Sequence, residues 1–326
     1  MIKSSSAPDR HLTADELRRH ESVRQGLVRV ARFHCQTLRG LRAEGPVDQV
    51  VHQTRVTCKR MRALWRLIEP SSDPDWVKAE DRALRNAARA LSSYRDRDVA
   101  RPTLETLLAA ESSPSIKLSL DLLDLNQSSG ETASRVWTEA IEQAVDHGLA
   151  TLEESLSRLR PVPLLAGGWS ALAPGLEVSY RQGRRDWRLL LRKSDDDCFH
   201  DWRKRVKSLH FQLCFLRGMD PDGLDPLIEG LRKLGNTLGR EHDLQVLRDQ
   251  AQDREKNFRA VVSFAPLHKR VAKALARLRK KALRQGEALY GGKTPVWSEA
   301  MGARWRNWKT PSATPSEDVS GIRVLV

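Results

Sequence analysis

The chain has 326 residues, of which 40% are hydrophobic, and this is enough to build a substantial folded core. Lysine and arginine number 56 against 42 acidic residues, so the net charge of +14 predicts a polyanionic partner and leaves open which one. No apolar run of about 18 residues predicts a membrane span, and the four cysteines form no CxxC pair, so we expect a cytoplasmic protein without a metal or other cofactor.

Helical spacing of the apolar residues dominates the sequence and predicts an all-α fold. Residues 1–12 are polar and are expected to form a flexible tail. A first helical bundle is predicted over residues 13–160, and a second over residues 169–308. Prolines and glycines in residues 161–168 mark the linker between them, and residues 309–326 are expected to form a second flexible tail.

The predicted helices follow from the same spacing in each half. Those of the first half are Thr13–Arg42, Val47–Ile68, Pro74–Leu91, Val99–Ala110, Ser115–Leu125 and Glu131–Arg160. Those of the second half are Trp169–Lys193, Asp197–Arg217, Pro226–Leu238, Asp243–Ala260, Pro266–Tyr290 and Pro295–Trp308.

Two short motifs each occur twice along the chain. The motif H-x-x-R-x-x-x-K begins at His52 and again at His200. A motif R-D/E-x-D, looser in its second copy, follows at Arg95 and at Arg240. Because both motifs recur in the same order, we infer an internal duplication.

Each copy of the histidine motif places a charged stripe beside an apolar one on the same helix. In the first copy the basic residues fall within roughly an 80° arc of the helix, at 100° per residue; they are His52, Arg55, Lys59, Arg62 and Arg66. The apolar stripe beside them is Val51, Thr54, Cys58, Met61, Trp65 and Ile68. In the second copy the charged stripe is His200, Arg203, Lys207, His210 and Arg217, and the apolar stripe is Phe199, Trp202, Val206, Leu209, Leu213 and Leu216.

Crowding of one sign of charge predicts an anion-binding groove. The segment from Val50 to Ile68 has five basic residues and no acidic one, whereas a solvated helix face normally mixes signs. Arginine makes bidentate contacts to phosphate, lysine supplies a mobile charge, and histidine gains charge beside a phosphate. The alternative is that these residues are simply solvated, with both histidines hydrogen-bonded in the core, but it does not predict the duplication.

Further basic residues lie outside the two motifs. Arg181 and Arg184 are one helical turn apart and extend the predicted site. The segment Lys269–Arg284 also contains no acidic residue, but a helix can expose Lys and Arg for solubility alone, and this is the simpler interpretation of that segment.

The acidic residues of the second motif have three possible roles. Asp98 and Asp243 are expected to orient ligand-binding arginines, with Arg95 and Arg240 beside them in a supporting role. Each aspartate also begins a helix-like segment, so an N-cap is an equal alternative. Divalent-cation binding is a third.

The repeated H-x-x-R-x-x-x-K element, followed in each half by R-D/E-x-D, resembles the CHAD family, the conserved histidine α-helical domain. The resemblance extends from about Arg24 to Trp308 and includes Tyr180 to Arg185 and the residues Leu289, Tyr290, Lys293 and Pro295. It departs from the family pattern at His210, where tyrosine is common, at the looser second acidic motif, and at Cys214, where repeat symmetry predicts arginine.

The resemblance implies two pseudo-symmetric four-helix bundles with long antiparallel helices. It also implies binding of inorganic polyphosphate by the basic residues of the histidine helices, with Lys293 in support, and association with polyphosphate granules. The departures suggest that the second half contributes less to binding. The oligomeric state stays open.

Rival functions are less well supported by the sequence. We expect no catalysis, because the E-x-E-x-K metal motif of triphosphate-tunnel hydrolases, a Walker lysine loop and a G-x-S-x-G motif are all missing. The pair His242-Asp243 is like the dipeptide of HD phosphohydrolases, but its repeat partner is Arg97-Asp98, so we interpret it as coincidence. Capture of an acidic protein segment is a lesser possibility.

Binding of RNA or single-stranded DNA is the main alternative, since the chain has nine tryptophans. Trp65 and Trp202 fall on the apolar stripes and are expected in the core. An aromatic and basic patch near the C-terminus could still stack bases; it comprises Trp297, Trp305, Trp308, Arg304, Arg306 and Lys309. Nucleic acid is therefore expected at least as a competitor for polyphosphate.

Overall fold

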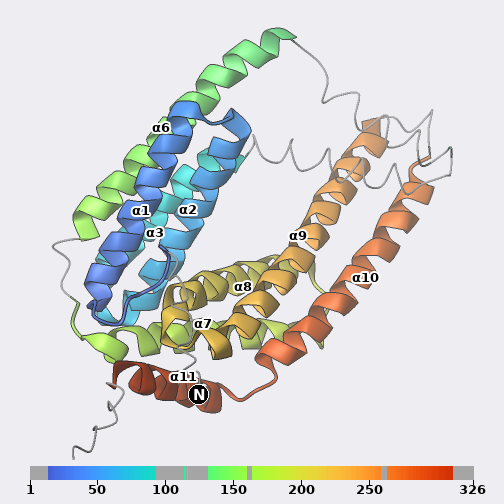
Figure 1. The fold of residues 1–326 in the computed structure, drawn as a ribbon. Coiled ribbons are helices and arrows are strands. Elements are labelled where there is room, and N and C mark those ends of the chain that lie inside the picture. The colour runs from blue at the N-terminus through green and yellow to red at the C-terminus, as the bar shows by residue number, and fades with distance from the viewer. Residues whose placement is uncertain are drawn as a thin grey trace, which may run out of the picture.

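The computed structural model describes residues 14–92, 114, 116, 131–159, 164–257 and 263–310. Every regular element in these ranges is a helix, so the predicted all-α class is confirmed. None of the helices in these ranges has an apolar stretch long enough to cross a membrane. The helices form two groups that pack together at an angle (Figure 1). The domain boundaries and the pseudo-symmetry of the halves stay predictions.

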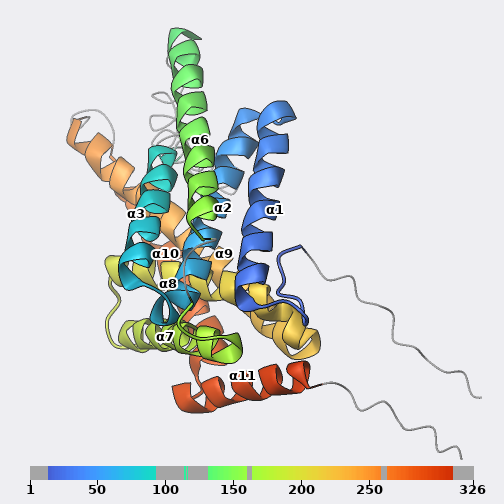
Figure 2. The ribbon, with the colours of Figure 1, turned by 90° about the vertical axis from the view of Figure 1, so that its left-hand side faces the viewer.

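The first group consists of four helices that lie alongside one another (Figures 1 and 2). They are α1 (Val23–Glu44), α2 (Val47–Ile68), α3 (Pro74–Ala90) and α6 (Glu131–Leu159). Each of the first three ends where its sequence supplies a stop. Gly45 and Pro46 separate α1 from α2, and Asp73 caps α3, whose first residue is a proline. Connections this short make neighbouring helices antiparallel.

The first helix begins later than the sequence predicted, at Val23 rather than Thr13. Ser22 and Gln25 form a reciprocal capping box, which satisfies two backbone N–H groups and sets the start of the helix. Residues 14–22 instead run across the second group, where the backbone N–H of Leu17 donates to the carbonyl of Phe215 at 2.7 Å. Burial of Leu17 holds this segment in place.

The second group contains the remaining helices and includes the second histidine helix. It consists of α7 (Gly168–Leu190), α8 (Asp196–Leu216), α9 (Pro221–Asn257), α10 (Ala265–Tyr290) and α11 (Thr294–Lys309). In Figure 1, α9 lies between α8 and α10, and α11 crosses the end of the group beside α7.

The sequence predicted a break near Gly239, but α9 continues through it as a single helix of 37 residues. A glycine inside a helix costs only about 1 kcal/mol. Burial of Leu238, Leu244 and Leu247 along the contacts with α8 and α10 outweighs that cost. Asp243 therefore lies within a helix, and its interpretation as an N-cap is wrong.

The two groups share one apolar core, and α2 packs directly on α7 and α8. Trp65 of α2 and Trp202 of α8 are both fully buried in it. The side-chain amide of Gln212 on α8 donates to the carbonyl of Ala63 on α2 at 2.9 Å. At Gly175, α7 approaches α2 so closely that a Cβ would lie 2.8 Å from the carbonyl oxygen of Arg66 and would overlap that of Leu67. The two histidine helices are thus held in a fixed relation.

We predict that Gly175→Ala destabilises the protein by about 1–3 kcal/mol, because the added methyl group meets rigid backbone of α2 and forces the groups apart. Gly40→Ala is the matched control, since its Cβ meets nothing within 4 Å and it lies on the exposed side of α1. That variant should be neutral or more stable by up to about 1 kcal/mol. Thermal unfolding followed by circular dichroism measures both, and equal melting temperatures would contradict the close packing.

Candidate functional site

The apolar stripes of both histidine helices lie in the core, as the sequence predicted. Every member of the stripe on α2 and of the stripe on α8 is at most 3% exposed. α2 and α8 also contact each other, and the charged stripes beside the buried faces lie on the same side of that contact.

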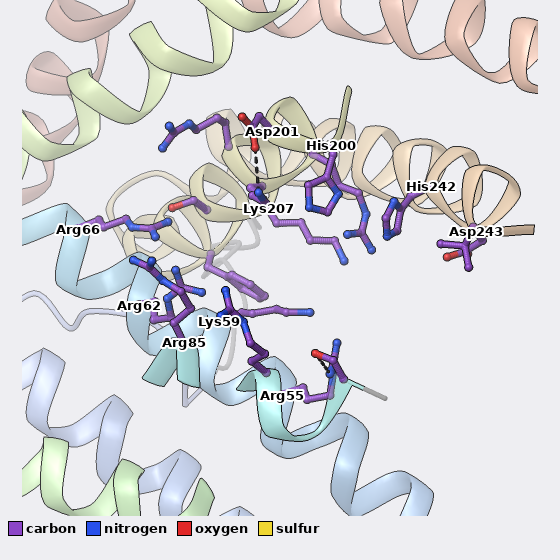
Figure 3. A pocket seen from close by; sticks show the side chains of 18 residues that line it. Arg55, Lys59, Arg62, Arg66, Arg85, His200, Asp201, Lys207, His242 and Asp243 are labelled. Atoms are coloured by element: carbon purple, nitrogen blue, oxygen red, sulfur yellow. Dashed lines mark hydrogen bonds and ion pairs between the residues drawn. The ribbon is translucent and has the colours of Figure 1, made fainter. Parts of the chain in front are cut away.

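The charged stripes line a cavity of about 600 Å³ between α2, α3, α8 and α9. Figure 3 shows Lys59 of α2 and Lys207 of α8 reaching into the space between their helices. The basic residues that line it are Arg55, Lys59, Arg62, Arg66, Arg85, Arg89, Arg203, Lys204, Arg205 and Lys207, with His200 and His242 beside them. Of the described residues that line it, only Asp201 and Asp243 are acidic, so this lining is strongly positive.

A second recess of about 160 Å³ adjoins the first. Both are lined by Arg55, Lys59, Lys207 and Phe211, so they form one continuous depression, which we call the basic groove. The recess adds three further basic side chains, namely His52, His210 and Arg232.

Most of the site residues predicted from the sequence come together in the basic groove. They are His52, Arg55, Lys59, Arg62, Arg66, His200, Arg203, Lys207 and His210. They reach it from α2 and α8, which the sequence places far apart along the chain. Their role in binding stays a prediction.

Arg181, Arg184 and Lys293 do not line the groove. Arg181 is exposed on α7 and pairs with Glu177 at 3.3 Å. The guanidinium of Arg184 donates to the carbonyl of Tyr290 at 3.1 Å, which satisfies the C-terminal end of α10. Lys293 is exposed at the start of α11. The sequence indicated the charge of these residues but not the side of the fold on which they lie.

The supporting residues of the acidic motif are only partly placed. Arg95 and Asp98 lie outside the described residues. Asp243 lines the groove from α9, whereas Arg240 is exposed elsewhere on that helix. Arg217, on the predicted charged stripe of α8, pairs with Glu16 and Asp225 away from the groove.

Several groove residues were not predicted as site residues. Arg85 and Arg89 are four residues apart on α3, a spacing that puts both on one helix face, but the sequence did not show which helix α3 would approach. Lys204 and Arg205 lie at variable positions inside the second histidine motif, and Arg232 lies on α9. The ring of His242 lies 4.8 Å from that of His200.

Asp81 on α3 orients three of the groove arginines. Its carboxylate accepts hydrogen bonds from Arg62 at 3.0 Å, Arg66 at 2.8 Å and Arg85 at 2.5 Å. Burial raises the pKa of Asp81, but the hydrogen bonds from Arg62 and Arg85 outweigh it, and the pKa falls to about 2. One negative charge thus fixes three positive ones, and the cluster stays cationic. The sequence predicts this role for Asp98 and Asp243, for which it stays a prediction, and does not single out Asp81.

Arg55 makes hydrogen bonds to two neutral groups of α3 and its C-terminal end. Its guanidinium donates to the carbonyl of Ala88 at 3.1 Å and to the hydroxyl of Ser92 at 2.8 Å. The side chain is only 8% exposed, as is that of Arg203 on α8. Contacts to neutral oxygens position a cation without cancelling its charge.

Two of the groove histidines, His200 and His210, have lowered pKa values. Burial and the neighbouring Lys204 and Arg203 lower the pKa of His200. Burial, Arg60 and Arg232 lower the pKa of His210 to about 4. At neutral pH both rings are therefore neutral in the unbound protein, and they supply hydrogen bonds rather than charge. The sequence-based prediction that histidine gains charge beside a phosphate therefore requires that a bound anion raise these pKa values.

The aromatic and basic patch near the C-terminus is packed against the protein. Trp305 is 7% exposed and lies against Trp169 and Trp308. Trp297 stacks on Tyr180 with ring centroids 4.1 Å apart. These rings do not form an open surface on which bases could stack.

Within the described ranges, no three His, Cys, Asp or Glu residues are arranged to hold a metal ion. The four cysteines are free thiols, and burial raises the pKa of Cys58 to about 12.

Comparisons with known proteins agree with this architecture. The family model described as "CHAD domain" matches residues 29–252. A crystal structure of the CHAD domain from the plant Ricinus communis superposes with a TM-score of 0.55 at 18% sequence identity, covering 91% of this chain and 96% of that one. At this identity the likeness shows the fold alone. A comparison with curated proteins found no significant match.

We predict that Asp81→Asn lowers the free energy of unfolding by about 1–2 kcal/mol at pH 7, because three arginines lose their shared carboxylate. Since folding lowers the pKa of Asp81 from 3.8 to about 2, its contribution is present above pH 3.8 and is lost as the pH falls through 2. The difference between wild type and variant should therefore shrink between pH 4 and pH 2.

Denaturant titration at several pH values measures this difference. Asp75→Asn on the same helix is the control, because Asp75 is 90% exposed and pairs only with Lys78 at its surface. It should cost about 0.5 kcal/mol or less. A difference between wild type and Asp81→Asn that does not vary with pH would refute the role given to this carboxylate.

Proposed function

The chain belongs to the CHAD family, and we propose that it binds inorganic polyphosphate in the basic groove. The observation that carries the proposal is the convergence of ten lysines and arginines from α2, α3 and α8 on one cavity, to which the described residues contribute only two acidic side chains. An assembly of this kind repels itself unless an anion occupies it.

The chemistry of the groove suits phosphate groups in series. Guanidinium groups bind phosphate oxygens in pairs, and Lys59 and Lys207 add mobile charges between them. Asp81 and the neutral partners of Arg55 fix the arginines before a ligand arrives, which lowers the entropy lost on binding. The larger cavity and the adjoining recess offer a path for a linear polymer between α2 and α8.

Binding would proceed by electrostatic capture. Each phosphate that meets a cation releases counterions, so affinity falls as salt rises and grows with the length of the polymer. The proposal includes association with polyphosphate granules and assigns the groove no catalytic step. Nucleic acid is the competing ligand, and the burial of Trp65, Trp202 and Trp305 removes the stacking surfaces that would favour it.

We predict that the double variant Lys59→Gln, Lys207→Gln binds long-chain polyphosphate about ten- to a hundredfold more weakly, since it removes two mobile charges from the groove. Calorimetric titration at about 0.15 M salt measures the affinity. Arg32→Gln, Arg306→Gln is the charge-matched control, because both arginines are exposed and neither lines the groove. Circular dichroism checks that each variant is folded.

The same titration in competition with single-stranded RNA of matched charge tests the ligand. Polyphosphate that RNA does not displace supports the proposal. Equal loss of affinity in groove variant and control would show that only net charge matters, and stronger binding of RNA would put nucleic acid in the place of polyphosphate.

We predict that binding takes up protons and strengthens as pH falls from 8 to 5.5. The pKa values of His200 and His210 are low in the unbound protein, and phosphate groups beside them raise these values, so each ring gains a proton on binding. Titrations in buffers of different ionisation enthalpy measure the uptake.

Replacing His200 and His210 with glutamine should flatten this pH dependence. His147→Gln, an exposed histidine on α6, should leave it unchanged. If the double variant retains the wild-type pH profile, these histidines do not contact the ligand.

A further inference from the structure

The outward face of α10 carries a row of cations that the basic groove does not use. At 100° per residue, five exposed basic residues fall within roughly an 80° arc of the helix. We call this row the α10 stripe; it consists of Lys269, Lys273, Arg277, Lys280 and Arg284. It extends along about 22 Å of helix at 1.5 Å per residue. Glu287, the next exposed charge along that face, ends it.

The α10 stripe is separate from the groove. α10 packs on α9 and α7 through its apolar side, which includes Leu267, Val271 and Leu275. In Figure 1, α9 lies between α10 and the first group of helices. No residue of α10 lines either part of the groove.

Within the described ranges, several basic residues on other surfaces of the protein are ion-paired, whereas the members of the α10 stripe are not. Arg39 and Arg42 on α1 pair with acidic residues of α6, and Arg232 on α9 pairs with Glu229. On α10 itself, the inward-facing Arg279 pairs with Asp196 and Glu241. Among the residues that the structure describes, no member of the α10 stripe makes an ion pair or a side-chain hydrogen bond.

Such a stripe works against the stability of its own helix. Like charges four residues apart destabilise a helix by about 0.2–0.5 kcal/mol per pair, and the stripe contains several such pairs, including Lys269 with Lys273 and Lys280 with Arg284. Solubility alone would be served equally well by a face that mixes lysine and glutamate. A linear polyanion laid along the stripe would remove the repulsion.

We propose that the α10 stripe is a second binding site for linear polyphosphate, so that one molecule can hold two polymer strands. This inference rests on the proposed function of the groove. The exposed face from Lys269 to Arg284 has no aromatic residue, so it offers phosphate contacts without a platform for bases, and it favours the polymer of highest charge density.

Three variants of the full chain test the proposal. The stripe variant carries Lys269→Gln, Lys273→Gln, Arg277→Gln and Lys280→Gln. The dispersed control loses the same charge at exposed positions on other elements; it carries Arg18→Gln, Arg32→Gln, Arg192→Gln and Arg306→Gln. The groove variant is Lys59→Gln, Lys207→Gln. Every stripe position is exposed, so the stripe variant should fold and should melt no lower than wild type at low salt.

Two measurements are made with long-chain polyphosphate at about 0.15 M salt. Calorimetric titration separates binding events of different affinity, and light scattering detects particles in which bound polymer strands are linked by protein. We expect the stripe variant to lose about tenfold or more in affinity at the second event and to form no linked particles. The dispersed control should keep the second binding event and should form linked particles. The groove variant should keep only the second binding event.

The possible outcomes separate this inference from the proposed function. If the stripe variant matches the dispersed control, the second site does not exist. If the groove variant loses all binding, the groove is supported as the polyphosphate site and the proposed second site on the α10 stripe is rejected. If the groove variant binds as wild type while the stripe variant does not bind, the stripe is the site and the groove is not. If single-stranded RNA of matched charge forms the same linked particles in a stripe-dependent way, polyphosphate is the wrong ligand class.

Discussion

The packing of α2 against α7 and α8 is the contact on which the site depends. Burial of an apolar side chain the size of tryptophan contributes about 3 kcal/mol, and both Trp65 and Trp202 are fully buried in the shared core. Repulsion between solvated cations is worth only a few tenths of a kcal/mol per pair. The core can therefore hold two cationic stripes against each other in the absence of a ligand, and it leaves their electrostatic energy available for binding.

For anion binding in the groove, the excess of positive over negative side chains matters more than the total number of charges. Asp81 accepts hydrogen bonds from three arginines, so one negative charge positions three positive ones and the cluster keeps a net positive charge. A carboxylate for every arginine would order the side chains equally well but would abolish the attraction for an anion. The same excess of positive charge acts on His200 and His210. Together with burial, the neighbouring cations disfavour the protonated imidazole and lower the pKa values of both rings.

Local periodicity was sufficient to predict much of this arrangement. The bounds of α2 and the buried faces of α2 and α8 follow from apolar spacing, because burial selects one helix face. What failed depended on distant contacts. The continuity of α9 past Gly239 comes from packing on α8 and α10, and the side of the fold on which Arg184 lies is set by the end of α10. Asp81 was missed because no spacing on α3 shows that it faces the arginines of α2.

The groove and the α10 stripe illustrate two ways in which a protein can present positive charge. Groove arginines such as Arg55 are buried and fixed, so little rotamer entropy is lost when they bind a phosphate group. The stripe is solvated and its side chains are free to move, so each contact loses rotamer entropy and is screened within about 8 Å at physiological ionic strength. A solvated stripe favours rapid, reversible encounter with a polymer. A buried groove retains the polymer once it has entered, and the two together would allow strands to exchange on the outside while one remains bound within.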